Sequence, residues 1–571
     1  MSEEFIHEPR VAYFSMEIAL RGDIPTYSGG LGILAGDAVR TAADLEFPIV
    51  GVSLVSRAGY FRQLIDEHGR QVETPAPWDP QRWARLLNAK VAVMIEGRPV
   101  WVGAWLYVVD SPLGGRQPVL LLDTQFEENH RDDREITHYL YGGDDLYRLK
   151  QEMVLGIGGA RLLHALGFMV KAYHMNEGHS ALLGLEIMRR YSYAPGDLQA
   201  GESAYDLPRV RAMCRFTTHT PLDSGHDHFS YDLVERAFGG GQVDTFIEMP
   251  TLKKLAGEES LNMTRLALNL SEYVNGVAER HAQTSQKMYP GYHLHAITNG
   301  VHPFTWVTPG LRKLYDRYLP GWCHEPELLA RAEDFIPDAA VWDAHMAAKG
   351  ALIAKVAAQG GPALDANRPI LGFARRMTAY KRPDLLFTDI GRLKAIAAKY
   401  PFQIVLAGKA HPHDERGKQL IEELIRASRE LGAAVPTVFL ADYDMDLARL
   451  LVSGADVWIN TPLPPLEASG TSGMKAALNG VPNLSVLDGW WIEGCIEGVT
   501  GWAIGEPGGG LDDAAKSLYA KLEEVVLPLY YTNAAQPGAW QRVMKGAISK
   551  NGSYFNSHRM MRRYATEAYV G

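Results

Sequence analysis

Short apolar runs alternate with longer stretches of helical periodicity along most of this chain. The first half contains five such runs, which begin at Val11, Pro48, Val170, Cys214 and Leu294. Between the first two, the glycine-rich turn SGGLG at residues 28–32 opens a stretch with helical spacing up to about Leu45. Apolar strands separated by helices are typical of β-α-β units around parallel sheets. The pattern therefore predicts an α/β protein with largely parallel sheets.

A second β-α series follows a break in composition at residues 357–369, which read AAQGGPALDANRP. Because a stretch rich in Gly, Pro and Ala interrupts both helices and strands, we place a domain boundary there. The series contains five apolar runs, PILGFA, FQIVLAG, VPTVFLA, ADVWIN and PNLSVL. Helices are expected to begin at about Arg382, Asp414, Met445 and Ser472. This order predicts a second, doubly wound sheet.

Three parts of the chain follow from this interpretation. Residues 1–360 form an N-terminal Rossmann-like domain, residues 361–550 form a C-terminal one, and residues 551–571 form a helix that packs back on the first. Ligands of open α/β sheets bind at the carboxyl ends of the strands. Two Rossmann-like domains that face each other across a cleft would therefore share one site, to which both contribute.

Composition and charge narrow the function. The chain has 571 residues and a mass of 63.1 kDa, more than one hydrophobic core usually organises. Its formal net charge is -10 and its pI is about 6.0, so it has no basic footprint for nucleic acid or for a membrane surface. The start, MSEEFIHEPR, does not resemble a secretory signal, and no apolar run approaches about 18 residues. Three cysteines without a CxxC pair support neither a disulfide framework nor a zinc ribbon, and we expect a cytoplasmic protein.

The densest chemical signal is PPLEASGTSGMKAALNGVP at residues 464–482, where a strand is expected to end and a helix to begin. Retaining glycosyltransferases with two Rossmann domains, the GT-B fold, carry two glutamates at the separation of Glu467 and Lys475, the second on a nucleotide ribose. The ammonium group of Lys475 donates hydrogen bonds and accepts none, which disfavours a nucleotide-sugar donor. An amine in this place can instead form a Schiff base with an aldehyde cofactor.

Three features of the chain suit phosphate groups. Thr471 and Ser472 begin a helix, and the free N–H groups and dipole of a helix start attract an anion. The SGGLG turn lets backbone amides approach a phosphate closely, although a purely structural turn is an equal interpretation. Four cations follow an expected central strand and suit a phosphate clamp: Arg375, Arg376, Lys381 and Arg382.

Histidines gather in TTHTPLDSGHDHF and again at His411 and His413, but no HExxH motif and no third ligand on a helix accompany them. We therefore expect no metal site. His219 ends a strand on the same side as Asn176, Asn299 and the SGGLG turn. Neutral donors and acceptors at that edge suit the hydroxyl groups of a sugar.

Together these motifs resemble those of the glycogen and α-glucan phosphorylases, compact bacterial type. The shared blocks run in one order and span most of the chain: VAYFSMEIALRGD, SGGLGILAGDA, RLKQEMVLG, YHMNEGHSALL, TTHTPL, LNLSEYVNGVAERHA, ITNGVHPFTW, RRMTAYKRP, VLAGKAHP and EASGTSGMKAALNG. The resemblance implies the GT-B fold, with a glucan-binding first domain and a second domain that binds pyridoxal 5'-phosphate (PLP). It also implies reversible phosphorolysis of an α-1,4-glucan or maltodextrin by inorganic phosphate to α-D-glucose 1-phosphate, with retention of configuration.

Roles for single residues are also implied by the resemblance. Lys475 looks like the Schiff-base lysine, and the residues implied to hold the cofactor with it are Gly30, Arg375, Thr471, Ser472 and Tyr443. The residues implied to bind substrate phosphate are Arg376 and Lys381, with Tyr380 beside them. The residues implied to surround the glucosyl unit are Leu31, His219, Asn299, Glu467, Ser469 and Gly470, and His219 is counted among the catalytic groups.

This chain departs from the family pattern in a few places. Its first shared motif begins at residue 11, so we expect no control by N-terminal phosphorylation as in the animal enzymes. Arg375 stands where lysine is common and Ser472 where glycine is common, and both still offer an N–H donor. The preferred glucan length, the physiological direction, allosteric regulation and a homodimer stay open.

Two other functions also stay open. One is a nucleotide-sugar-dependent transferase of the same fold, against which the lysine at position 475 argues. The other is a non-catalytic glucan-binding relative of the phosphorylases, against which Lys475, Arg376 and Lys381 all argue, since each is present.

Overall fold

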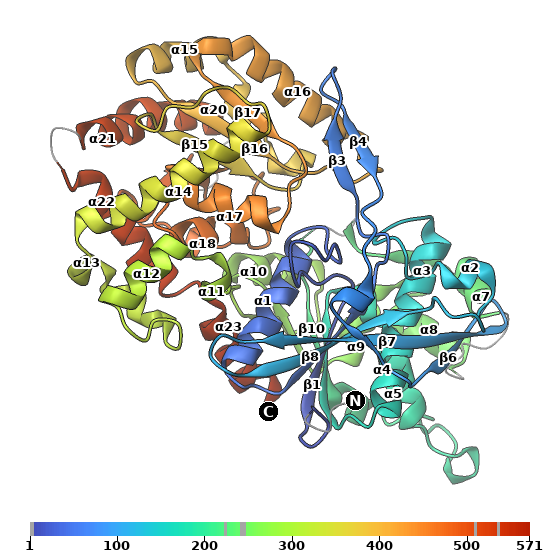
Figure 1. Ribbon diagram of the computed structural model, residues 1–571. Helices are drawn as coiled ribbons and strands as arrows, with labels where there is room; N and C mark the ends of the chain where they lie inside the picture. The colour runs from blue at the N-terminus through green and yellow to red at the C-terminus, as the bar shows by residue number, and fades with distance from the viewer. Residues whose placement is uncertain (1–4, 222–224, 240–246, 507–510, 534–536, 571) are drawn as a thin grey trace.

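The computed structural model describes residues 5–221, 225–239, 247–506, 511–533 and 537–570. Figure 1 shows two lobes: the blue to green residues form one, and most of the yellow to red residues form the other, before the chain returns to the first lobe at its end. Each lobe is built around one large sheet. The predicted α/β class is confirmed, with the two largely parallel sheets that the GT-B fold requires.

The first sheet has the strand order β14-β13-β10-β9-β1-β2-β8-β7-β5, and β6 pairs with β7. The strand bounds are β1 Arg10–Ser15, β2 Ile49–Leu54, β5 Arg85–Leu86, β6 Val91–Ile95, β7 Arg98–Asp110, β8 Arg116–Asp123, β9 Val170–Asn176, β10 Cys214–Thr217, β13 Tyr273–Gly276 and β14 His295–Ala296. All five runs predicted in the first half lie in this sheet. The sequence pattern does not predict the antiparallel strands β5 to β7, because no helix separates them as in a β-α-β unit.

The second sheet has the order β17-β16-β15-β18-β19-β20, and all its pairs are parallel. Its strands are β15 Ile370–Ala374, β16 Gln403–Ala407, β17 Thr437–Leu440, β18 Val457–Asn460, β19 Asn483–Val486 and β20 Gly501–Ile504. The five predicted strands are present, and β20 adds a sixth. The strand order reverses between β15 and β18, because the chain adds β16 and β17 on one side of β15 and then β18 to β20 on the other. In doubly wound sheets, ligands bind in the crevice at such a point.

Helices cover both sheets. In the first part of the chain they are α1 Gly30–Asp44, α2 Arg131–Arg134, α3 Asp145–Met153, α4 Gly159–Ala165, α5 Leu183–Arg190, α6 Leu207–Met213, α7 Tyr231–Phe238, α8 Met249–Ala256, α9 Met263–Leu270 and α10 Glu279–Met288. Later helices are α11 Pro303–Trp306, α12 Pro309–Tyr318, α13 Ala332–Phe335, α14 Asp338–Ala358, α15 Ile390–Lys399, α16 Glu415–Leu431, α17 Met445–Gly454, α18 Thr471–Leu478, α19 Trp491–Gly494, α20 Leu511–Lys521, α21 Leu527–Thr532, α22 Ala539–Gly546 and α23 Ser557–Arg563.

The helix expected from about Arg382 begins later, at Ile390. Arg382 has a left-handed backbone with φ of 44°, which ends a 3-10 turn. Its guanidinium donates to the carbonyl groups of Thr461 and Pro462 at 2.8 and 2.7 Å. Arg382 therefore holds the loop after β18 through Nε and Nη2, and its place in a phosphate clamp stays a prediction.

The last helical segment packs against the first lobe. The imidazole Nε2 of His558 lies 2.9 Å from a carboxylate oxygen of Asp44, at the end of α1. The hydroxyl group of Tyr569 lies 2.5 Å from Nδ1 of His174 on β9. These contacts connect the end of the chain to helix α1 and strand β9 of the first lobe.

Helix α14, in contrast, packs on the second sheet. The ammonium group of Lys349 and the imidazole of His345 lie 2.8 and 2.9 Å from the carboxylate of Asp456, which directly precedes β18. In Figure 1 the yellow α14 accordingly lies in the lobe of the second sheet. This packing favours a domain boundary before residue 360, and the bounds at 360 and 550 stay predictions.

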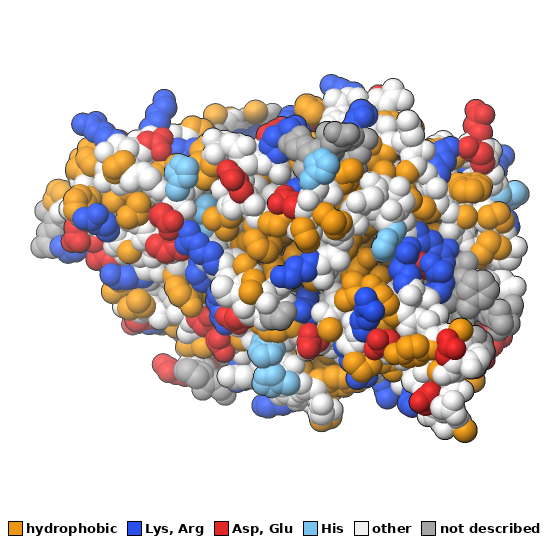
Figure 2. Space-filling model, turned by 90° about the horizontal axis from the view of Figure 1, so that it is seen from below, with side chains coloured by type: hydrophobic (Ala, Val, Ile, Leu, Met, Phe, Trp, Pro, Cys, Tyr) orange, Lys and Arg blue, Asp and Glu red, His pale blue; other side chains and the backbone are white. Residues whose placement is uncertain are grey.

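Charge of both signs is spread over one face of the molecule. Figure 2 shows acidic and basic side chains between hydrophobic ones on the face seen from below. None of the helices within the described ranges combines the length and the apolar character that a membrane span requires.

Candidate active site

The carboxylate of Glu17 holds the SGGLG turn. Glu17, in the segment after β1, accepts hydrogen bonds from the N–H groups of Ser28 and Gly29 at 2.6 and 3.0 Å, and from the hydroxyl group of Tyr141 at 2.9 Å. Helix α1 then begins at Gly30 without a capping side chain from the described residues. A Cβ added at Gly30 would meet no described atom within 4 Å, so there is open space beside this residue at the helix start. Glu17 thus uses the donors before Gly30 and leaves those of the helix for a ligand.

Helix α18 presents a second uncapped start. It follows Gly470, whose φ of 84° suits glycine, and no described side chain caps it. The hydroxyl group of Ser472 accepts a hydrogen bond from the Trp458 indole at 3.1 Å, which leaves its O–H and its backbone N–H as donors for an anion. Ser469, just before this start, has a buried hydroxyl oxygen without a partner in the described part of the chain.

Glu467 forms the charged centre of the site. Its carboxylate lies 2.5 Å from Arg375 and 2.6 Å from the Lys381 ammonium, and all three side chains are buried. Burial disfavours the ionised form, but the two cations outweigh it and lower the pKa of Glu467 to about 2. The sequence assigns the two cations to phosphate groups and Glu467 to a sugar, and the structure shows that they pair with one another. Arg375 keeps two buried donor nitrogens, Nε and Nη1, for which the described residues offer no acceptor.

Lys475 projects from α18 over an aromatic face. Its Nζ atom lies 3.9 Å from the ring centre of Trp306, and it has no hydrogen bond or ion pair with any described residue. The Trp306 indole donates to Asp37 on α1 at 2.8 Å, so α1, α11 and α18 meet at this amine. Burial lowers the pKa of Lys475 to about 8, against the opposing charge of Asp37. An amine with this pKa is partly unprotonated at neutral pH and can act as a nucleophile.

Asp488 supports the loop that carries Glu467. Its buried carboxylate accepts a hydrogen bond from the Glu467 N–H at 2.8 Å and another from the Gly489 N–H at 3.0 Å. Burial, with the charge of Glu467 added, raises the pKa of Asp488 to about 6. Sequence reasoning missed Glu17, Trp306, Asp37 and Asp488, since their roles depend on contacts between distant segments.

Arg376, the remaining cation of the predicted phosphate site, does not join the buried pairs around Glu467. Arg376 is exposed, unlike its neighbour Arg375. Burial and then the charge of Arg376 lower the pKa of His411 to about 4, and the same charge acts on Tyr60. The rings of Tyr60 and His411 lie 6.2 Å apart and come from different halves of the chain. Arg376 is therefore available to a ligand at the junction of the two lobes.

Two further predicted residues lie beside these cations. The Lys381 ammonium lies 4.5 Å from the ring centre of Tyr380, which places Tyr380 next to the pair around Glu467. Tyr443 is half-buried, and desolvation raises its pKa while the nearby charge of Arg375 opposes the rise. Both rings therefore lie near the cations with which the sequence groups them.

The sugar-suited residues lie at the carboxyl ends of the first sheet. His219 follows β10, and its Nε2 atom lies 2.6 Å from Oδ1 of Asn176 at the end of β9. Burial lowers the pKa of His219 to about 3, so its imidazole is neutral at neutral pH and acts as a hydrogen-bonding group. The side-chain oxygen of Asn299 is buried without a partner among the described residues. Leu31 lies in the first turn of α1, next to Gly30.

The sequence is similar to those of known proteins. A family model described as Phosphorylase, carbohydrate phosphorylase, matches residues 241–500. Maltodextrin phosphorylase of Thermococcus litoralis is 39% identical, over 98% of this chain and 70% of its own length. Glycogen phosphorylase of Aquifex aeolicus is 36% identical, over 99% of this chain and 87% of its own. The H isozyme of α-glucan phosphorylase from Solanum tuberosum is 25% identical, over 82% of this chain and 68% of its own.

Proposed function

The chain belongs to the carbohydrate phosphorylase family, and from this premise we propose that it is an α-glucan phosphorylase that uses PLP attached to Lys475. The proposed reaction is the reversible phosphorolysis of an α-1,4-glucan to α-D-glucose 1-phosphate. The observation that carries the proposal is the Lys475 amine: it is buried, without a polar partner among the described residues, and has a lowered pKa.

The donors around Lys475 fit a phosphate ester that carries an aldehyde. Arg375 has two buried donor nitrogens without an acceptor in the part of the chain described. The starts of α1 at Gly30 and of α18 at Thr471 both lack a capping side chain from the described residues. Each of these groups would gain a partner from a bound phosphate. When bound there, PLP would supply a 5'-phosphate group able to exchange a proton with the substrate phosphate.

The protein's own contribution is to neutralise and position charge. Two phosphate groups side by side repel each other strongly in a site with little water. Arg375, Arg376 and Lys381 supply three positive charges there, and Glu467 pairs with two of them, Arg375 and Lys381. We propose that substrate phosphate binds Arg376 and draws Lys381 toward it.

The glucosyl unit would be bound by neutral hydrogen-bonding groups and by the carboxylate of Glu467. The Ser469 hydroxyl and the Asn299 amide oxygen, both buried without partners in the described residues, suit the hydroxyl groups of glucose. Neutral His219 adds a further hydrogen-bonding group at the ends of β9 and β10. Because phosphate attacks the face from which the glycosidic oxygen leaves, the configuration is retained, and no carboxylate nucleophile is needed.

Borohydride reduction followed by peptide mapping tests this proposal. We expect one pyridoxyl adduct, on Lys475, in protein supplied with PLP. Lys475→Arg should give none, whereas Lys381→Arg, the matched exchange of another buried lysine nearby, should keep the adduct. An adduct on a different lysine, or none in the wild-type protein, would show the assignment to be wrong.

A further inference from the structure

A two-stranded hairpin connects the lobes next to the candidate site. Strands β3 (Arg62–Ile65) and β4 (Gln71–Thr74) leave the first lobe and reach the second beside α16, as Figure 1 shows. Side chains alternate on the hairpin: Gln63 and Gln71 are buried, whereas Leu64 and Val72, on the opposite face, are 55% and 42% exposed. The polar face is therefore the one that packs on the second lobe.

The two glutamines bond to the backbone of the second lobe. The Gln63 amide donates to the carbonyl groups of Gly408 and of the Gln71 side chain, both at 2.8 Å, and accepts from the N–H of Asp442 at 2.9 Å. The Gln71 amide donates to the Ala410 carbonyl at 2.9 Å and accepts from the Ala410 N–H at 3.0 Å. The hairpin thus holds the loops that follow β16 and β17.

These loops border the predicted phosphate cations. The N–H of Arg375 donates to Ala407 at 3.3 Å, and the N–H of Met377 donates to Lys409 at 2.9 Å. Arg376 lies between these two bonds, so the position of the 408–410 loop sets the position of its backbone. A Cβ at Gly408 would lie 2.1 Å from the Arg375 carbonyl, which shows how closely the two loops are packed.

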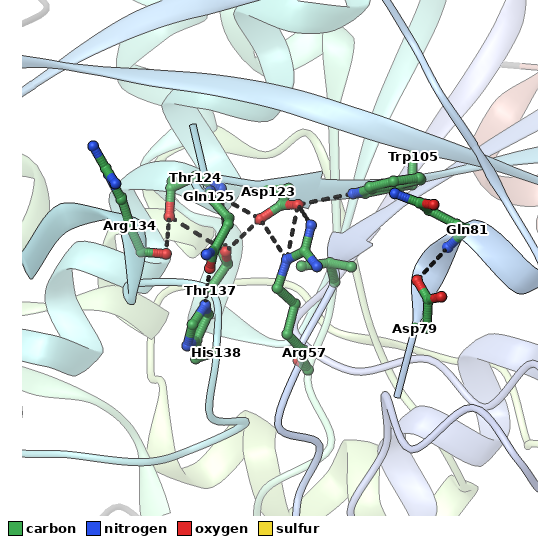
Figure 3. Close-up of polar contacts among 12 residues, drawn as sticks. Arg57, Asp79, Gln81, Trp105, Asp123, Thr124, Gln125, Arg134, Thr137 and His138 are labelled. Atoms are coloured by element: carbon green, nitrogen blue, oxygen red, sulfur yellow. Dashed lines mark hydrogen bonds and ion pairs between the residues drawn. The ribbon is translucent and has the colours of Figure 1, made fainter. Parts of the chain in front are cut away.

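The base of the hairpin is anchored as well. Arg57, just before the hairpin, forms an ion pair of 2.5 Å with Asp123 at the end of β8, and the Trp105 indole donates to the same carboxylate at 2.8 Å (Figure 3). Both ends of the connection between the lobes are therefore fixed by buried or half-buried polar contacts.

We propose that Gln63 and Gln71 are positioning residues that hold Arg376 in place for phosphate binding. The inference rests on the proposed function, because it takes Arg376 as a phosphate ligand. The side-chain amides are neutral, so they bond to the backbone without adding charge beside a phosphate site. They also join a segment of the first lobe to the loops of the second, so the phosphate site depends on how the two lobes are held together.

Gln63→Ala tests the inference, with Leu64→Ala, on the same strand but the exposed face, as the matched control. Steady-state kinetics with phosphate varied should show about a tenfold rise in the KM for phosphate in Gln63→Ala, while the KM for maltodextrin changes little. Leu64→Ala should behave like the wild type. Hydrogen exchange, which does not require activity, should be faster in the peptide covering 372–381 of Gln63→Ala alone.

Gln63→Glu separates positioning from simple stability. Its ionised carboxylate accepts from Asp442 but cannot donate to Gly408, whereas the protonated form can. We expect its phosphate KM to approach the wild-type value as the pH falls, with no such recovery in Gln63→Ala. Unchanged phosphate KM and unchanged exchange in Gln63→Ala would overturn the inference. Loss of activity in the wild type would count against the proposed function instead, and exchange would still decide the positioning role.

Discussion

Replacing Glu467 by glutamine tests the charge arrangement at the centre of the site. Glu467 lies 2.5 Å from Arg375 and 2.6 Å from Lys381, and all three side chains are buried. The substitution keeps the shape of the side chain and removes its charge, so two buried cations lose their counter-ion. Burial opposes the ionisation of Glu467, but these cations outweigh it and lower its pKa from 4.5 to about 2.

A shift of this size corresponds to about 3 kcal/mol of folding free energy. Removal of one partner from a buried ion pair costs about 3–5 kcal/mol, which agrees. We therefore expect the free energy of unfolding of Glu467→Gln to be about 3 kcal/mol lower than that of the wild type at neutral pH. Because the folded pKa lies below the unfolded one, this contribution is complete above pH 4.5 and is lost as the pH falls toward 2.

Denaturant unfolding at neutral pH and at about pH 3.5 measures both effects. Glu523→Gln is the matched control: Glu523 pairs with Arg392, which is 45% exposed, and its loss should cost about 1 kcal/mol or less. Inorganic phosphate should stabilise Glu467→Gln more than the wild type, because it restores a negative charge beside the two cations. A difference below about 1 kcal/mol at neutral pH, or one that does not shrink in acid, would refute the reasoning.

Three further predictions concern other parts of the site. Arg376→Ala should keep PLP bound and lower kcat/KM for phosphate and glucose 1-phosphate by about tenfold or more, because alanine cannot bind phosphate bidentately; unchanged kinetics with both would exclude the role. Gly408→Ala should lower the free energy of unfolding by about 2 kcal/mol or more, since φ is 152° and the new Cβ would lie 2.1 Å from the Arg375 carbonyl. Thermal melts measure this loss, and Gly196→Ala, with open space around it, should have little effect in the same measurement. The Asp488 carboxyl keeps its proton to higher pH in the folded than in the unfolded protein, so the free energy of unfolding should decrease as the pH rises from 3.8 to about 6. Denaturant titrations across this range should show that Asp488→Asn lacks this decrease.

Some expectations held because they depend on neighbours along the chain. The apolar runs, the SGGLG turn and the helix start at Thr471 are all local, and the structure has β1, α1 and α18 where the pattern predicts them. The helix expected from about Arg382 begins only at Ile390, for a reason that no local pattern reveals. The Arg382 guanidinium bonds to carbonyl groups 79 and 80 positions away, and the backbone there adopts a left-handed turn.

The features of the candidate site also fall into those that the sequence determines and those that only the tertiary structure decides. The sequence by itself determines the fold class and which residue types stand at the strand ends, because periodicity and turn chemistry act over a few positions. The tertiary structure alone decides that Glu467 neutralises Arg375 and Lys381, that Trp306 covers Lys475, and that Gln63 reaches across to Gly408. Burial and Coulomb interaction depend on distance in space, and the partners in each of these contacts lie many residues apart in the chain.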